Sequence, residues 1–232
     1  MCHGAPSSAF PEPGPCETMR GPVEAFVYGE ADAATTVAII PDIYGCNPFY
    51  RGFATYLAQK GARVFLVNPF AGLGELEEVT REKAFERRHG VQDKAFLDQF
   101  ESFLQDQGIG AVVGFCLGGL YVMELARRGN TATLIGLYPF PAGLQNQDPL
   151  PVPLDTLEDV RTPQTILVGD QDAGAGIDNV KTMADIATRN TALDLHVYEG
   201  SGHGFLADLD SADPHLKQNA QDAVAVCVQR LF

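Results

Sequence analysis

Basic side chains are scarce in this sequence. It has 16 Lys and Arg residues against 30 Asp and Glu residues, which gives a formal net charge of −14. Such a surface repels phosphate backbones and anionic lipid headgroups, so we expect no nucleic-acid binding and no membrane binding. The acidic residues are dispersed along the chain, and they predict solvated faces in place of a cation site.

Long apolar runs are missing as well. No segment approaches the roughly 18 apolar residues of a transmembrane helix. The first residues also lack the basic and then apolar layout of a secretory signal. We therefore expect a cytoplasmic protein, and the sequence leaves its oligomeric state open.

Paired cysteines and cofactor motifs are the third absence. The cysteines stand far apart, with no C-x-x-C pair, at Cys2, Cys16, Cys46, Cys116 and Cys227. An odd number of isolated cysteines favours free thiols over a disulfide framework or a zinc site. The sequence has no H-E-x-x-H, G-x-G-x-x-G or P-loop motif, so we expect no metal and no organic cofactor.

Proline content and apolar periodicity divide the chain into two parts. Residues 1–22 contain five prolines and no apolar period, which predicts an extended N-terminal arm. From residue 23 to 232, short apolar runs alternate with amphipathic segments, which is typical of a single α/β domain with a mostly parallel sheet and helices on both faces. The expected strands are Val23–Tyr28, Val37–Ile40, Arg63–Val67, Ala111–Phe115, Thr133–Leu137, Thr165–Val168 and Leu193–Tyr198.

Apolar side chains at helical spacing predict helices that face the core. Two such stripes are Phe49, Phe53, Tyr56 and Leu57, and then Phe96, Phe100, Phe103 and Leu104. The last helix should begin with Asp213 as N-cap and Pro214 in its first turn, and it should bury Cys227. The proline-rich segment 139–163 is consistent with a pocket wall beyond a strand end or with a plain surface connection.

A cysteine stands between a strand and a helix near the middle of the chain, in Gly114-Phe115-Cys116-Leu117-Gly118-Gly119. The G-x-C-x-G pattern in this position is typical of a nucleophile elbow, a strained turn whose glycines leave room for backbone and substrate. The helix N-terminus behind it would stabilise a thiolate and donate to a developing oxyanion. Cys116 is the predicted nucleophile, and a buried structural cysteine is the alternative.

Two later strand ends supply an acid and a histidine. Asp170 and Asp172 follow one strand, and His203 follows the next strand between two glycines. This chain order of nucleophile, acid and histidine is expected of α/β-hydrolases, where the three groups meet at the carboxyl edge of the sheet. We predict His203 as the base and Asp172, further past its strand, as the acid. His196 lies inside a strand pattern and is predicted to be a core residue.

The loop Pro41-Asp42-Ile43-Tyr44-Gly45-Cys46-Asn47 follows an early central strand. In α/β-hydrolases a loop in this place supplies one oxyanion N–H, and the residue after the nucleophile supplies the other. The expected donors are the backbones of Ile43 and Leu117.

These motifs together resemble one family. The order P-D-I-Y-G-C-N, G-F-C-L-G-G, G-D-Q-D and G-H-G-F resembles the dienelactone hydrolase family, cysteine hydrolases with a minimal α/β-hydrolase fold and no separate lid domain. The resemblance runs from about Val37 to the C-terminus. It implies a nucleophile, base and orienting acid at Cys116, His203 and Asp172, with oxyanion donors at Ile43 and Leu117.

Two departures from the family pattern bear on the chemistry. The family has Glu where this chain has Asp42, a carboxylate thought to take the thiol proton when substrate arrives, and Asp has a reach shorter by one methylene. Members that cleave dienelactone hold the substrate carboxylate with arginines, one of them four residues after the histidine, where this chain has Ala207. This absence predicts a preference for uncharged esters or lactones, unless an upstream arginine restores the contact. The candidates are Arg81, Arg87 and Arg88.

The sequence thus predicts a hydrolase of small activated esters or lactones that forms a thioester acyl-enzyme. Two other interpretations stay open. A class I glutamine amidotransferase also has a G-x-C-x-G elbow, with an acid two residues after the histidine, where this chain has Phe205. A redox-sensing or non-catalytic thiol protein on the same scaffold would use Cys46 or Cys116.

Overall fold

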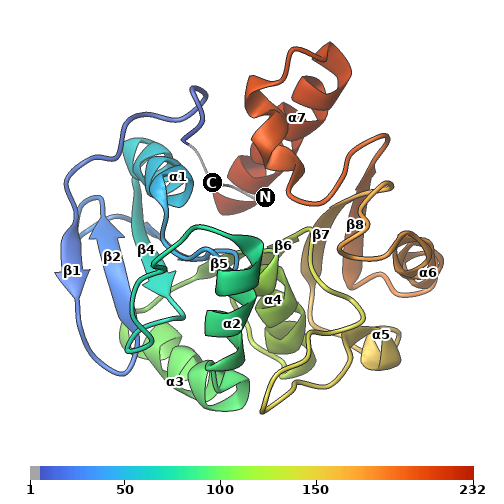
Figure 1. Cartoon of the computed structure of the whole chain (residues 1–232), viewed down its shortest axis with the longest axis horizontal. Helices are drawn as coiled ribbons and strands as arrows, with labels where there is room; N and C mark the ends of the chain where they lie inside the picture. The colour runs from blue at the N-terminus through green and yellow to red at the C-terminus, as the bar shows by residue number, and fades with distance from the viewer. Residues whose placement is uncertain (1–5) are drawn as a thin grey trace.

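The computed structural model describes residues 6–232, which form an eight-stranded sheet between two layers of helices (Figure 1). The strand order is β1-β2-β4-β3-β5-β6-β7-β8. Strands β3 to β8 run parallel, whereas β2 is antiparallel to both of its neighbours. The strands are β1 (Glu17–Met19), β2 (Glu24–Tyr28), β3 (Thr35–Ile40), β4 (Ala62–Asn68), β5 (Ala111–Phe115), β6 (Thr133–Leu137), β7 (Gln164–Gly169) and β8 (Leu193–Tyr198). The helices are α1 (Pro48–Gln59), α2 (Arg81–His89), α3 (Asp93–Asp106), α4 (Leu117–Arg127), α5 (Pro153–Thr156), α6 (Ile177–Ala187), the 3₁₀ helix η1 (Phe205–Asp210) and α7 (Pro214–Leu231).

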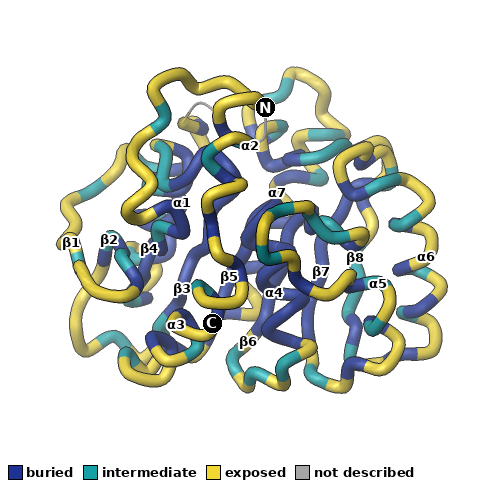
Figure 2. The backbone as a smooth tube through the Cα atoms, turned by 60° about the horizontal axis from the view of Figure 1, so that its bottom comes forward, coloured by how far each residue is buried: buried dark blue, intermediate teal, exposed yellow. Residues whose placement is uncertain are grey.

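Successive side chains of the central strands point to opposite faces of the sheet, and each face therefore has its own hydrophobic core. In β3, Ala38 and Ile40 belong to the core that also contains residues of α2, α3, α4 and α6, while Val37 and Ile39 belong to the core that contains residues of α1 and α7. All four side chains are fully buried, and Figure 2 shows the central strands as the buried middle of the molecule. The predicted α/β-hydrolase fold, with a mostly parallel sheet and helices on both faces, is confirmed, and residues 6–232 contain no separate lid domain.

The seven strands predicted from the sequence are all present, and their ends shift by at most two residues. The N-terminal arm contains a strand that the sequence did not predict. Its residues Glu17–Met19 form β1 at the sheet edge, and Phe10 is buried against Phe49 and Phe53 of α1. A three-residue, mostly exposed edge strand has no apolar run that could signal it in the sequence.

The histidine in β8 corrects another expectation. His196 is not a core residue, because β8 is the last strand of the sheet and one of its flanks is uncovered. Its side chain is 32% exposed and lies 3.3 Å from the Asp194 carboxylate. A strand pattern alone does not tell an edge strand from a central one.

The last helix follows its prediction closely. The Asp213 side chain accepts hydrogen bonds from the N–H groups of His215 and Leu216, Pro214 stands in the first turn, and Cys227 is fully buried. None of the helices within residues 6–232 is long and apolar enough to cross a bilayer.

The direction in which the chain winds changes at β3. The connection from β3 through α1 leads to β4 on one side of β3, whereas the connection from β4 through α2 and α3 returns to β5 on its other side. These helices pack on opposite faces of the sheet. In open α/β sheets, ligands bind at the carboxyl edge beside such a point, and here the loops after β3 and β5 meet there.

Candidate active site

Cys116 occupies a strained turn between β5 and α4. Its backbone has φ 55° and ψ −104°, values that a residue with a side chain rarely adopts. A Cβ on Gly114 would lie 2.1 Å from the Gly118 carbonyl oxygen, and a Cβ on Gly118 would lie 2.2 Å from the Ile40 carbonyl oxygen. Only glycine fits at both places, so the G-x-C-x-G spacing allows strand, turn and helix to pack this closely.

His203 lies against an acid from the neighbouring strand end. Its Nδ1 is 2.9 and 3.0 Å from the two carboxylate oxygens of Asp172, which is fully buried. Asp170 instead accepts a 2.8 Å hydrogen bond from the Gly200 N–H. Of the two aspartates considered from the sequence, the structure brings Asp172 to the histidine.

Packing fixes the plane of the His203 ring. The Tyr138 and Phe140 rings lie 5.5 and 5.2 Å from it between centroids. On another side, a Cβ on Gly174 would lie 2.7 Å from His203 Nδ1, so the ring needs a glycine at this position. An imidazole held in this way keeps Nδ1 directed at Asp172.

The loop after β3 is a tight turn with Asp42 at its base. The Asp42 side chain is fully buried, and its Oδ1 accepts a 2.8 Å hydrogen bond from the Tyr44 N–H. The Asp42 carbonyl oxygen accepts a 3.0 Å hydrogen bond from the Gly45 N–H, and Gly45 has φ 80°, which favours glycine. The turn places Ile43 in the wall of the cavity that contains Cys116.

One cavity of about 310 Å³ joins these parts. It is lined by Ile43, Tyr44, Arg81, Phe85, Cys116, Phe140, Ala173, Gly174 and His203. Ligand pockets of proteins begin at about this size, so the cavity suits a small substrate. Asp42 and Leu117 adjoin lining residues in the chain, and Asp172 lies behind His203.

The structure distinguishes the three arginines of α2. Arg81 lines the cavity together with Cys116. Arg87 lies on the other side of the loop after β3, where its Nη2 donates to the Ile43 carbonyl oxygen at 3.1 Å. Arg88 is buried, and its Nη2 is 2.6 Å from the Asp93 carboxylate. Of the three, Arg81 is the arginine that can meet a substrate in the cavity.

The remaining thiols have different surroundings. The Cys46 Sγ donates to the Val67 carbonyl oxygen at 3.3 Å, and burial raises the pKa of this thiol to about 12. Burial raises the pKa of Cys227 to about 12 as well, whereas Cys16 is exposed. Cys2 lies outside the described residues. Each of the four described cysteines is a thiol outside any disulfide, in agreement with the prediction.

Phe85 and Ala173 were not singled out from the sequence. Phe85 stands one helical turn after Arg81, and this spacing is the one sequence signal that could have pointed to it. Phe140 belongs to the proline-rich segment, so that segment does contribute to the pocket wall. Within residues 6–232, no three His, Cys, Asp or Glu side chains are grouped to hold a metal ion.

Comparison with known proteins agrees with the fold and the motifs. The model of the dienelactone hydrolase family matches residues 23–231. Carboxymethylenebutenolidase 2 of Cupriavidus pinatubonensis is 49% identical over 214 residues, which covers 92% of this chain and 91% of the relative. A carboxymethylenebutenolidase of Rhodococcus opacus is 28% identical, covering 90% and 87% of the two chains.

A solved structure supports the same conclusion at the level of the fold. The crystal structure of a candidate dienelactone hydrolase from Klebsiella pneumoniae has a TM-score of 0.76 at 22% identity, over 90% of this chain and 92% of that one. This chain belongs to the dienelactone hydrolase family, and it is a hydrolase of the dienelactone hydrolase type.

Proposed function

We propose that this chain hydrolyses a small carboxylic ester or lactone, with Cys116 as nucleophile, His203 as general base and Asp172 as the acid that orients His203. The observation that carries the proposal is the strained Cys116 turn in one cavity with the His203–Asp172 pair. A nucleophile, a base within reach and a third group that orients the base are the parts that covalent catalysis requires.

Acylation begins with the thiol proton. Asp42, buried at the base of the oxyanion turn, accepts this proton as substrate binds, and the Cys116 sulfur attacks the carbonyl carbon. The carbonyl oxygen becomes an oxyanion that accepts hydrogen bonds from the N–H groups of Ile43 and Leu117. The C–O bond then breaks, the leaving oxygen takes up the proton that the thiol gave, and a thioester remains.

Deacylation uses the histidine. His203 takes a proton from water, and the resulting hydroxide attacks the thioester carbonyl. The C–S bond breaks, the carboxylic acid leaves, and the proton on His203 returns to the sulfur. The Asp172 carboxylate, 2.9 Å from Nδ1, stabilises the imidazolium that forms in this step.

The position of Arg81 in the cavity wall favours a substrate that carries a carboxylate. Its guanidinium stands in the wall of a cavity whose other walls are largely apolar, where a charge-assisted hydrogen bond contributes about 1.5–3 kcal/mol. The relative at 49% identity is named for carboxymethylenebutenolide, a lactone with a carboxylate arm. We therefore propose a carboxylate-bearing lactone as substrate. The preference for uncharged substrates, which was expected from Ala207, gives way to the alternative that the sequence left open.

The site does not support the two other interpretations, an amidotransferase and a redox-sensing thiol protein. Phe205 stands where an amidotransferase has its acid, and it is buried against Tyr138 and Tyr198. The Cys46 thiol, with its pKa raised to about 12, does not form the thiolate that redox chemistry needs at neutral pH.

The nucleophile is tested by trapping the acyl-enzyme. With p-nitrophenyl acetate, rapid acid quench and peptide mass spectrometry should find an acetyl group on Cys116, and Cys116→Ala should lose both the adduct and turnover. Cys227→Ala, at a buried cysteine outside the cavity lining, is the control that should keep both. Turnover of Cys116→Ala near the wild-type rate would overturn the proposal.

The substrate class is tested with two matched aryl esters, one ending in a carboxylate and one in its methyl ester. Arg81→Gln should lower kcat/KM for the carboxylate ester by about 10- to 100-fold, as expected for the loss of a charge-assisted hydrogen bond, and change the methyl ester little. Lys83→Gln removes a charge from the exposed face of the same helix and serves as control. Equal changes for the two esters would argue against carboxylate binding at Arg81.

A further inference from the structure

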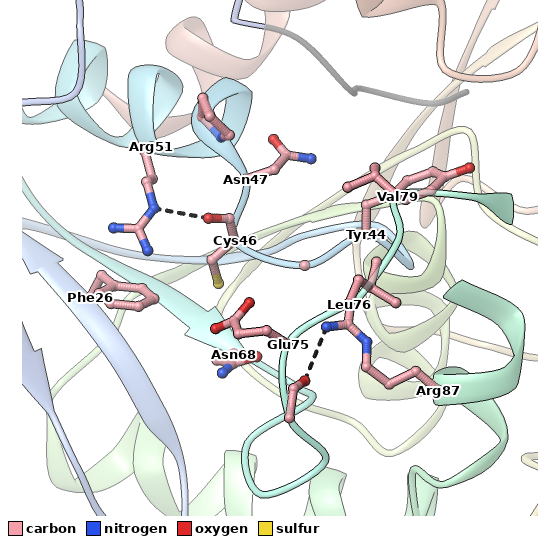
Figure 3. A pocket seen from close by; sticks show the side chains of 13 residues that line it. Phe26, Tyr44, Cys46, Asn47, Arg51, Asn68, Glu75, Leu76, Val79 and Arg87 are labelled. Carbon is pink, nitrogen blue, oxygen red and sulfur yellow. Dashed lines mark hydrogen bonds between the residues drawn. The ribbon is translucent and has the colours of Figure 1, made fainter. Parts of the chain in front are cut away.

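A second cavity lies behind the loop that follows β3. It has a volume of about 230 Å³, and Tyr44 lines both this cavity and the catalytic one. Two arginines approach it from opposite sides, Arg51 from α1 and Arg87 from α2 (Figure 3). Arg51 Nε donates to the Cys46 carbonyl oxygen at 2.9 Å, and Arg87 holds a carbonyl oxygen nearer the start of the same loop. Two cationic side chains thus bind the loop after β3 on the side away from the Cys116 cavity.

The Arg87 guanidinium has a well-defined place. Its Nη2 donates to the Ile43 carbonyl oxygen at 3.1 Å, and its Nη1 donates to the Gly74 carbonyl oxygen at 3.4 Å. The Phe70 ring lies below it, 4.1 Å from the guanidinium carbon. A Cβ on Gly45 would already lie 3.4 Å from Nη2. Contacts from three sides therefore keep this guanidinium at the Ile43 carbonyl.

The Ile43 carbonyl belongs to a peptide group that also donates a hydrogen bond to Asp42. The N–H at the other end of this planar group is that of Tyr44, and it donates to Asp42 Oδ1 at 2.8 Å. The C=O and N–H of a trans peptide point in opposite directions, so Arg87 fixes the direction of the N–H by fixing the oxygen. A cation at the oxygen also polarises the peptide and strengthens its hydrogen bond to the carboxylate.

We propose that Arg87 is a positioning residue for the hydrolysis: through the Ile43–Tyr44 peptide it holds the buried Asp42 carboxylate, and the turn that carries the Ile43 N–H, in their working geometry. This inference rests on the proposed function, in which Asp42 takes the thiol proton. A fully buried carboxylate needs donors in place of water to stay charged, and the Tyr44 N–H is one of them. Burial lowers the pKa of Arg87, whereas the charges of Glu75 and Asp42 raise it.

The experiment compares Arg87→Gln with wild type on p-nitrophenyl acetate, an uncharged ester that offers the guanidinium no carboxylate. The rate of the nitrophenol burst, which reports acylation, should fall by about 10- to 100-fold at saturating ester, as for the loss of a hydrogen bond to a charged group. The ester concentration at half-maximal burst rate should stay within about twofold of wild type. The acid limb of the pH profile should move to higher pH, because the charged form of Asp42 has lost a polarised donor.

Two further variants separate positioning from a merely structural role. Arg87→Lys keeps the cation without the paired donors, so it should recover part of the burst rate and part of the pH shift. Lys83→Gln removes one charge from the same helix without touching the loop, and it should match wild type. Thermal unfolding of each variant records whether it folds. If Arg87→Gln does not fold, the burst rate and pH profile of Arg87→Lys decide the question.

A double-mutant cycle tests whether Arg87 acts through Asp42. In the Asp42→Asn background, Arg87→Gln should lower the burst rate several-fold less than it does in wild type, because the part of its effect that acts through the Asp42 charge is already gone. Three outcomes would overturn the inference. They are a loss of burst rate in the Asp42→Asn background as large as in wild type, a change in Arg87→Gln confined to the half-saturating ester concentration, and a wild-type pH profile in the Arg87 variants. Failure of the proposed function is distinguishable, since it would appear as an active Cys116→Ala enzyme or an Asp42→Asn enzyme with the wild-type burst rate.

Discussion

At the scale of single residues, the surroundings of each thiol decide which one can react. The thiolate is the attacking form, and the pKa of about 12 that burial gives to Cys46 and Cys227 keeps both almost wholly protonated at pH 8. Because the raised pKa favours the neutral form, their reactivity should grow only as the pH approaches 12. Cys116 stands instead at the N-terminus of α4, in the cavity with His203.

Inactivation by sub-stoichiometric iodoacetamide at pH 8 should therefore follow the labelling of Cys116. Exposed Cys16 can also be labelled, so Cys16→Ser is the matched control and should lose activity at the same rate as wild type. Peptide mass spectrometry at several times of reaction gives the correlation. Loss of activity that follows modification of Cys46 while Cys116 stays unlabelled would contradict the assignment.

The two aspartates after β7 provide a second prediction at this scale. Asp172→Asn removes the charge beside His203 Nδ1 and should lower kcat far more than it changes KM, toward the roughly 10⁴-fold loss of an equivalent exchange in a serine triad. Asp170→Asn keeps an oxygen that can accept from the Gly200 N–H, so it should stay close to wild type. Steady-state kinetics on one ester suffice, and equal defects in the two variants would remove the distinction between them.

At the scale of helices and strands, a buried cluster ties α2 to α4, the helix that follows Cys116. The Asp93 carboxylate of α3 accepts a 2.6 Å hydrogen bond from the Tyr121 hydroxyl of α4 and forms a 2.6 Å ion pair with Arg88 of α2. All three side chains are almost fully buried. Breaking a buried cluster of this kind by removing one partner leaves the others without compensation.

Tyr121→Phe should lower the free energy of unfolding by about 1–3 kcal/mol, the cost of a buried group that loses its partner. The variant should also discriminate less between the carboxylate ester and its methyl ester, because α2 carries Arg81. Urea unfolding and the ratio of kcat/KM values measure the two effects. Tyr56→Phe, at a partly exposed tyrosine of α1, is the control and should change stability by less than about 0.5 kcal/mol. An unchanged stability of Tyr121→Phe would show that the cluster does not hold α2.

The arginines of α2 belong to the part of the site that the sequence does not predict. The Cys116 elbow, His203 and the β3 loop were predictable because each follows its strand within a few residues, and the parallel sheet brings such ends to one edge. Which of Arg81, Arg87 and Arg88 lines the cavity was not predictable from the sequence. Arg81 and Arg88 are seven residues apart and share a helix stripe, yet one lines the cavity and the other is buried in the core.

The reason is that the place of α2 depends on contacts between distant parts of the chain. Arg88 pairs with Asp93, which in turn accepts a hydrogen bond from Tyr121, 28 residues further on, and Arg87 contacts the Ile43 carbonyl, 44 residues before it. No local sequence pattern links the residues of these two long-range contacts. Strand β1 was missed for a related reason, since it exists by pairing with β2 and has no apolar run of its own.

At the scale of the whole molecule, the excess of acidic residues opposes the binding of the proposed carboxylate-bearing substrate. The formal net charge of −14 repels an approaching carboxylate, whereas Arg81 attracts it at short range inside the cavity. The two effects differ in their dependence on salt. Charges spread over the surface are screened beyond about 10 Å at 0.1 M ionic strength, and a contact inside a cavity is screened much less.

Raising the ionic strength from about 0.01 to 0.3 M should therefore increase kcat/KM for the carboxylate ester several-fold, because the Debye length falls from about 30 Å to below 10 Å and the long-range repulsion is lost. The methyl ester should show almost no change and provides the control for salt effects on the enzyme itself. Arg81→Gln should show the same relative increase from a lower starting value, since salt acts on the surface charge and not on the contact in the cavity. A kcat/KM for the carboxylate ester that falls with salt would mean that the local field of Arg81 and its neighbours outweighs the net charge of the molecule, and that the cavity attracts anions from solution.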